Sequence, residues 1–158
     1  SVEAHVRSTA WSGEKIVGGR LSGLLELGEQ VTWEGRHFGV VQRFTSRITA
    51  FERPDFFQDQ MVRGAFRSLE HDHSFGPADV GEGDGAGGAN GADAGGPNGA
   101  TCMTDVLRFR APLGPLGWLA ERMVLGPYLR HFVRRRGSVL KALAESDEWR
   151  HYLPAGAG

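Results

Sequence analysis

The repeat of hydrophobic residues changes from two to about 3.6 residues near residue 115, and this change limits the folds open to the chain. Before it, segments rich in Val, Ile, Thr, Phe and Trp predict strands at 30–41, 42–52, 56–63 and 68–75. A half-buried strand is expected at 101–112, a weaker one at 11–17 and a short apolar one within 18–30. Together these segments predict an antiparallel meander followed by a helix, which is an α+β fold.

The residues after 115 have the period of one long amphipathic helix. Its apolar stripe consists of Leu116, Leu119, Ala120, Met123, Val124, Tyr128, Leu129, Phe132, Val133, Leu140, Leu143 and Ala144. Gly126 and Pro127 interrupt the stripe, and because proline removes a helical hydrogen bond, a kink or short break is expected there. We interpret the opposite face as exposed to solvent, and it carries Arg122, Arg130, Arg134, Arg135, Arg136 and Lys141.

That basic face leaves other partners open. It could bind a membrane surface or a partner protein. It lacks the interleaved aromatic residues that single-stranded nucleic acids stack on, so no nucleic-acid partner is expected.

Residues 76–100 have a composition of their own. They contain 10 of the 24 glycines, no Lys or Arg, and four acidic residues, which are Asp79, Glu82, Asp84 and Asp93. Such a segment cannot bury enough apolar surface to offset its ordering entropy, so we expect a flexible loop inserted between two strands. A phosphate-binding loop is the alternative, but the segment lacks a Gly-Lys-Ser/Thr ending and no helical pattern follows it directly.

Length and composition set broad limits. A chain of 158 residues with 23% charged residues is ordinary for a single globular domain, expected at 1–158. The net charge of −1 gives no global reason for nucleic-acid binding, and the single cysteine, Cys102, cannot form an internal disulfide. No apolar run approaches the roughly 20 residues of a membrane span, and the first residues lack the pattern of a signal peptide. A cytoplasmic protein is expected.

The stretch "LEHDHSF" at 69–75 carries the strongest chemical signal. On a strand, Leu69, His71, His73 and Phe75 share one face, so two imidazoles lie among apolar side chains. We favour a hydrogen bond from one of them to Asp105, because an unpaired buried polar group costs about 1 to 3 kcal/mol.

Two alternatives stay open for this stretch. An acid/base pair tuned by Asp105 would suit proton transfer. A metal site would need further donors, for which His37, Glu34 and Asp105 are present without a recognised spacing. Neither a metal nor another cofactor is expected, and Cys102 has no features of a nucleophile.

Several short motifs resemble those of bacterial SRPBCC proteins, also called START-like or Bet v 1-like, in particular the polyketide cyclase/dehydrase branch of ligand-binding proteins. The motifs are Pro54, Phe57 and Asp59; Gly64 and Phe66; His71, His73 and Phe75; Thr101, Met103 and Asp105; and then Pro112, Gly114 and Gly117. The resemblance covers about residues 10–144. It implies a helix-grip fold, in which a curved antiparallel sheet wraps around a long C-terminal helix.

The resemblance also implies a cavity between sheet and helix that binds a hydrophobic small molecule such as a lipid, a quinone or a polyketide-like compound. The alternative function is a cyclase/dehydrase in which His71, His73 and Asp105 transfer protons. The expected lining is Trp33, His37, Phe44, Phe57, Met61, Leu69, His71, His73, Met103, Asp105, Leu107, Trp118 and Met123.

Two features depart from the pattern that the resemblance implies. The sequence starts inside the region where such proteins have a helix, so the first strand of the sheet is expected to be missing. Its unpaired neighbour would then favour self-association. The 76–100 loop is also longer than the usual turn at that place.

Overall fold

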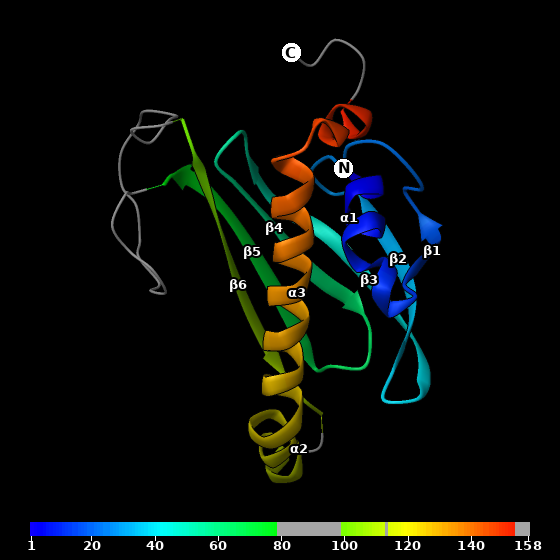
Figure 1. The fold of residues 1–158 in the computed structure, drawn as a ribbon. Helices are drawn as coiled ribbons and strands as arrows, with labels where there is room; N and C mark the ends of the chain where they lie inside the picture. Colours follow the sequence, from blue (N-terminus) through cyan, green and yellow to red (C-terminus); the bar gives the residue numbers. More distant parts are fainter. Residues whose placement is uncertain (79–98, 113, 154–158) are drawn as a thin grey trace.

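The computed structural model describes residues 1–78, 99–112 and 114–153. Six antiparallel strands form one sheet in chain order: β1 (Lys15–Gly19), β2 (Gln30–His37), β3 (Val40–Glu52), β4 (Phe56–Arg63), β5 (Ser68–Pro77) and β6 (Thr101–Arg110). The helices are α1 (Val2–Thr9), α2 (Gly114–Ala120) and α3 (Gly126–Ala144), with short helical turns at Ala10–Ser12, Glu121–Leu125 and Asp147–Tyr152. A long C-terminal helix lying across an antiparallel sheet is the α+β plan of the helix-grip fold (Figure 1).

The four strands expected between residues 30 and 75 are all present, with ends that differ by a few residues. The β2–β3 hairpin is tight because Phe38 and Gly39 both have positive φ, 53° and 79°, as a two-residue hairpin turn requires. The strand at 101–112 is also present as β6, and Ala78 N–H donates to the carbonyl of Ala100 at 3.0 Å beside it. The long segment therefore joins two neighbouring strands, although residues 79–98 themselves lie outside the described residues.

The N-terminal part differs from expectation in two places. The weak strand begins at Lys15 rather than near Trp11, which lies in a helical turn. The short apolar strand expected within 18–30 does not form beyond the end of β1. Gly23 and Gly28 have φ of 83° and 84°, which breaks an extended run, and Leu25 packs instead against the core cluster of Val2, Val31 and Trp33.

The expected break in the C-terminal helix is present at Gly126 and Pro127. The turn Glu121–Leu125 is π-helical, and Gly126 N–H donates to the carbonyl of Glu121, five residues earlier. Because Pro127 has no N–H, the regular pattern of helical hydrogen bonds is interrupted here, beside the wider turn. As a result α2 lies beyond the end of the sheet and only α3 crosses it (Figure 1).

The face of the sheet that α1 and α3 cover, called the inner face below, holds the core. Trp33 of β2 stacks on His5 of α1, and His37 of β2 contacts Tyr128 and Phe132 of α3, which identifies this face. Among the described residues, the buried apolar side chains are Val2, Val31, Trp33, Ile48, Leu69 and Leu143. Most other inner-face side chains are only half-buried, so α3 does not seal the sheet. None of the helices in the described residues is long and apolar enough to span a membrane.

Candidate functional site

The strand register brings the expected site residues of β4, β5 and β6 together. His71 pairs with Leu107 of β6 and with Asp59 of β4, while His73 pairs with Asp105 and with Phe57. Directly paired residues on neighbouring strands point to the same face of a sheet. The inner face therefore has a polar centre inside an apolar surround.

The other expected lining residues divide into two groups. The strand residues share the inner face by the same alternation, namely Trp33, His37, Phe44, Met61, Leu69 and Met103. Trp118 and Met123 are 62% and 66% exposed and line no enclosed space. Their placement differs from expectation because the helix is broken, and α2 with the π-helical turn lies past the sheet.

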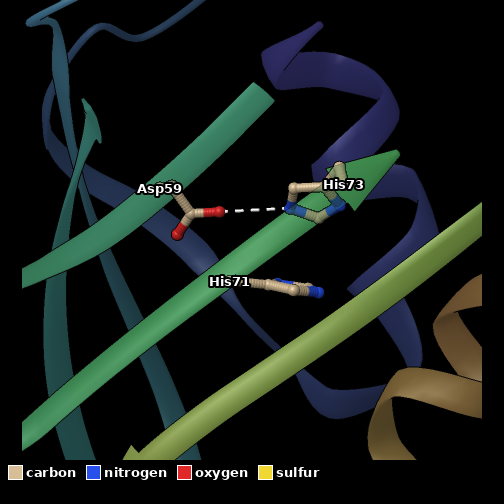
Figure 2. Close-up of side chains that lie close together, drawn as sticks. All are labelled: Asp59, His71 and His73. Atoms are coloured by element: carbon tan, nitrogen blue, oxygen red, sulfur yellow. Dashed lines mark hydrogen bonds and ion pairs between the residues drawn. The ribbon is translucent and has the colours of Figure 1, made fainter. Parts of the chain in front are cut away.

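His73 is the centre of the cluster and is only 1% exposed. Its Nδ1 lies 2.6 Å from Oδ1 of Asp105, and its Nε2 lies 3.2 Å from Oδ2 of Asp59 (Figure 2). Phe57 stacks on the imidazole with a ring distance of 4.1 Å. The hydrogen bond expected between Asp105 and one of the two histidines is thus made by His73, whose ring is held on both edges and on one face.

His71 is also buried, with 8% of its surface exposed, but it has fewer partners than His73. Its Nε2 lies 3.3 Å from the same Oδ1 of Asp105, but the geometry is not that of a hydrogen bond, and within the described part of the chain this nitrogen has no other partner. The two imidazole centres are 3.9 Å apart. One histidine of the pair is therefore fixed, and the other keeps an unused donor or acceptor.

The environment displaces the pKa values of the two histidines in opposite directions. Burial lowers the pKa of His73, but its hydrogen bonds to Asp105 and Asp59 outweigh burial and raise the pKa above the ordinary value. Burial lowers the pKa of His71 and is only partly opposed by Asp105. For Asp105 itself, burial is outweighed by the two imidazoles, which hold its pKa well below the usual range. His73 is therefore the more basic of the two imidazoles.

Arg136 of α3 also belongs to the site. The sequence predicted it on the solvent-exposed face of the helix, and that prediction is wrong. Arg136 is 9% exposed, and its Nε has no hydrogen-bond partner among the described residues. Its positive charge lowers the pKa of His71, His73 and Asp105, so it lies within electrostatic range of the cluster. Position 136 is four residues after Phe132 and four before Leu140, and this spacing was the signal that it belongs to the apolar stripe.

A second polar group ties β2 to α1 and α3. Nδ1 of His37 lies 2.6 Å from the hydroxyl oxygen of Tyr128, and its Nε2 lies 3.5 Å from Oε1 of Glu14. Burial of Glu14 is outweighed by hydrogen bonds from His37 and His5, which lower the pKa of this carboxyl to about 2. Gly35 makes room for the group, because a Cβ there would lie 2.8 Å from Cγ of Glu14. His37, expected to line a ligand site, is thus engaged in a connection between elements.

Two hollows in the described part of the chain lie away from the inner-face cluster. One, of about 300 Å³, is lined by α1, β1 and the C-terminal turn, with Val2, Val6, Ile16, Leu21 and Tyr152 among its walls. The other, of about 270 Å³, lies against β5 and β6 and includes Glu70 and Arg108. Neither includes any of the thirteen residues expected to line a ligand cavity.

Comparison with known proteins gives distant likenesses to solved structures. No family model matches the chain, and no curated protein matches it. Among solved structures, the crystal structure of Ara h 8.0201 is similar with a TM-score of 0.41 and 13% sequence identity, over 89% of this chain and 90% of that chain. A likeness this distant indicates neither a ligand nor a reaction.

Proposed function

We propose that the protein binds a hydrophobic small molecule, such as a lipid, a quinone or a polyketide-like compound, on the inner face beneath α3. The observation that carries this proposal is that large apolar side chains of the inner face, including Phe44, Phe57 and Phe75, stay half-buried although helices cover that face. Apolar surface left accessible between packed elements is a common feature of ligand sites. A bound apolar molecule would supply the contacts that the protein's own side chains do not make.

The polar centre limits the chemistry of that molecule. Arg136 provides a buried positive charge with an unpaired Nε, and His71 provides an unpaired ring nitrogen. Buried groups of this kind favour a ligand with an oxygen that accepts hydrogen bonds or carries negative charge, such as a carboxylate, an enolate or a quinone carbonyl. The ligand is therefore an amphipathic molecule with one polar end.

Native mass spectrometry of the protein purified from its own host tests this proposal. The expected result is a co-purified apolar compound, together with saturable binding of a fluorescent fatty acid. Arg136→Met should weaken binding of the fatty acid by about tenfold or more, and binding of the matching fatty alcohol by less, because the substitution keeps the alkyl stem and removes the charge. Folded protein that binds neither probe would contradict the proposal.

An acid/base enzyme is the second candidate, and the opposite pKa displacements of His71 and His73 favour it. A neutral His71 would remove a proton from a carbon next to a carbonyl, and a protonated His73 would deliver one to the oxygen, as a cyclase/dehydrase needs. His71→Gln and His73→Gln should then each reduce turnover of a polyketide-like substrate by about 100-fold while binding persists. Saturable binding of such substrates without turnover would leave the protein as a binder alone.

A further inference from the structure

Three side chains of the inner face place potential metal ligands close together. One nitrogen of His71, one nitrogen of His73 and one oxygen of Asp59 lie within 4.8 Å of one another (Figure 2). All three project from β4 and β5, where Asp59 pairs directly with His71. Because strand pairing fixes the positions of the Cβ atoms, the three side chains are held close together on the inner face.

The contact between His73 and Asp105 orients the ring for this role. Nδ1 donates to Oδ1 of Asp105 at 2.6 Å, and Nε2 faces Oδ2 of Asp59, 3.2 Å away, so a bound ion would take the place of the proton that Nε2 carries in the ion-free protein. Two electron-pair donors can face each other at this distance only with a proton or a cation between them. Two ligand atoms about 2.1 Å from one tetrahedral Zn²⁺ ion are about 3.4 Å apart, which is close to the observed separation. A carboxylate on the far nitrogen is also the usual support of a metal-binding histidine.

His71 contributes a second observation that is independent of His73. It is more than nine-tenths buried, and its Nε2 has no hydrogen-bond partner in the described residues. Leaving such an atom unpaired is unfavourable, and coordination of an ion through Nε2 would satisfy it.

The local charge is compatible with a cation. Asp59 and Asp105 provide two carboxylates, and Arg136 is a positive side chain within electrostatic range of the cluster. An ion that displaces the proton of His73 leaves both imidazoles neutral, so the carboxylates outnumber the guanidinium.

We propose that Asp59, His71 and His73 bind one divalent transition-metal ion of the Zn²⁺ class, with Asp105 as a positioning residue. Two imidazoles and one carboxylate form a set used for Zn²⁺ and for neighbouring first-row ions, and they leave at least one coordination position open. The proposal does not depend on the hydrophobic ligand, because the three residues coordinate the ion by themselves.

Calorimetry with Zn²⁺ on the untagged, chelator-treated chain tests the proposal, with Co²⁺ as a coloured substitute. We expect one ion per chain and intense visible absorption from Co²⁺ at a site of low coordination number. Asp59→Asn and His73→Gln should each weaken binding by at least about tenfold. Asp105→Asn should weaken it by about 10- to 100-fold without changing the Co²⁺ spectrum, as loss of a supporting hydrogen bond does.

His131→Gln is the matched control, because His131 is exposed on α3 and distant in sequence from the ligand set. This variant should bind like the unmodified chain. Imidazole NMR signals of the unmodified chain give a readout that needs no variant, since Zn²⁺ should shift the signals of His71 and His73 selectively. Absence of stoichiometric binding would overturn the proposal. So would binding that persists in Asp59→Asn and His73→Gln, or shifts confined to other histidines, since either would place the ion elsewhere.

Discussion

At the scale of single residues, the pair of His73 and Asp105 is the most constrained interaction of the site. Removing one partner of a buried ion pair leaves the other uncompensated, so Asp105→Asn should destabilise the metal-free protein by about 3 kcal/mol. The raised pKa of His73 gives stability that is complete below its ordinary 6.5 and lost as pH rises through the folded value. The lowered pKa of Asp105 gives stability that is complete above 3.8 and lost as the solution becomes more acidic. In urea unfolding with chelator present, Asp105→Asn should therefore lose the most unfolding free energy, relative to the unmodified chain, between pH 3.8 and 6.5. A loss that stays constant up to pH 9 would contradict this assignment.

Residues of the site differ in how far the sequence reveals them. Alternation along one strand was enough to place His71 and His73 on one face, and the same alternation placed Asp105 with them. Asp59 was visible only as part of a motif, because its approach to His73 depends on the β4–β5 register. His37 and Tyr128 meet across 91 positions of sequence, with Glu14 on the other side of His37, and no local pattern reports a contact of that range.

At the scale of elements, the packing of α3 against the sheet sets how deeply the inner-face side chains are buried. Phe132 packs against Trp11 at 5.0 Å and against His37 at 6.0 Å between ring centres. Phe132→Ala should lower the free energy of unfolding by about 3 kcal/mol, at the lower end of the range for buried rings because Phe132 is half-buried. Arg134→Ala is the control on the exposed face, with an expected change within about 0.5 kcal/mol. Arg135 is unsuitable, because its guanidinium lies 4.3 Å from the ring centre of Trp11. Equal losses of unfolding free energy in Phe132→Ala and Arg134→Ala, measured by chemical denaturation, would mean that the faces of α3 are assigned wrongly.

The break before α3 explains why helix periodicity alone gave two wrong placements. A continuous stripe from Leu116 to Ala144 predicted one surface against the sheet. The π-helical turn adds a residue to one turn and changes which side chains align on either side of it. Proline marks where such a change occurs but not how the chain accommodates it, so Trp118 and Met123 were assigned to the wrong surroundings.

At the scale of the whole molecule, the order of strands followed from the sequence because each strand pairs with its neighbour in the chain. Short connections, such as the two-residue turn at Phe38 and Gly39, leave few alternatives to a meander. Packing between layers was less predictable, because it depends on the distance between α3 and the sheet. Within the described strands, β1 and β6 each have one neighbour, and self-association through such an edge stays a prediction.

The long connection between β5 and β6 gives a prediction for the whole molecule. Ten residue pairs join these strands, from Ser68 with Arg110 to Pro77 with Thr101, so their register is set before the connection begins. Replacing residues 79–98 by a short Gly-Ser linker should change the free energy of unfolding by no more than about 1 kcal/mol, because the entropy of loop closure depends only logarithmically on length. Urea denaturation and fatty-acid binding of the shortened chain provide the measurement. Unchanged stability with lost binding would show that the segment contributes to the ligand site, whereas a large loss of stability would show that it packs against the sheet.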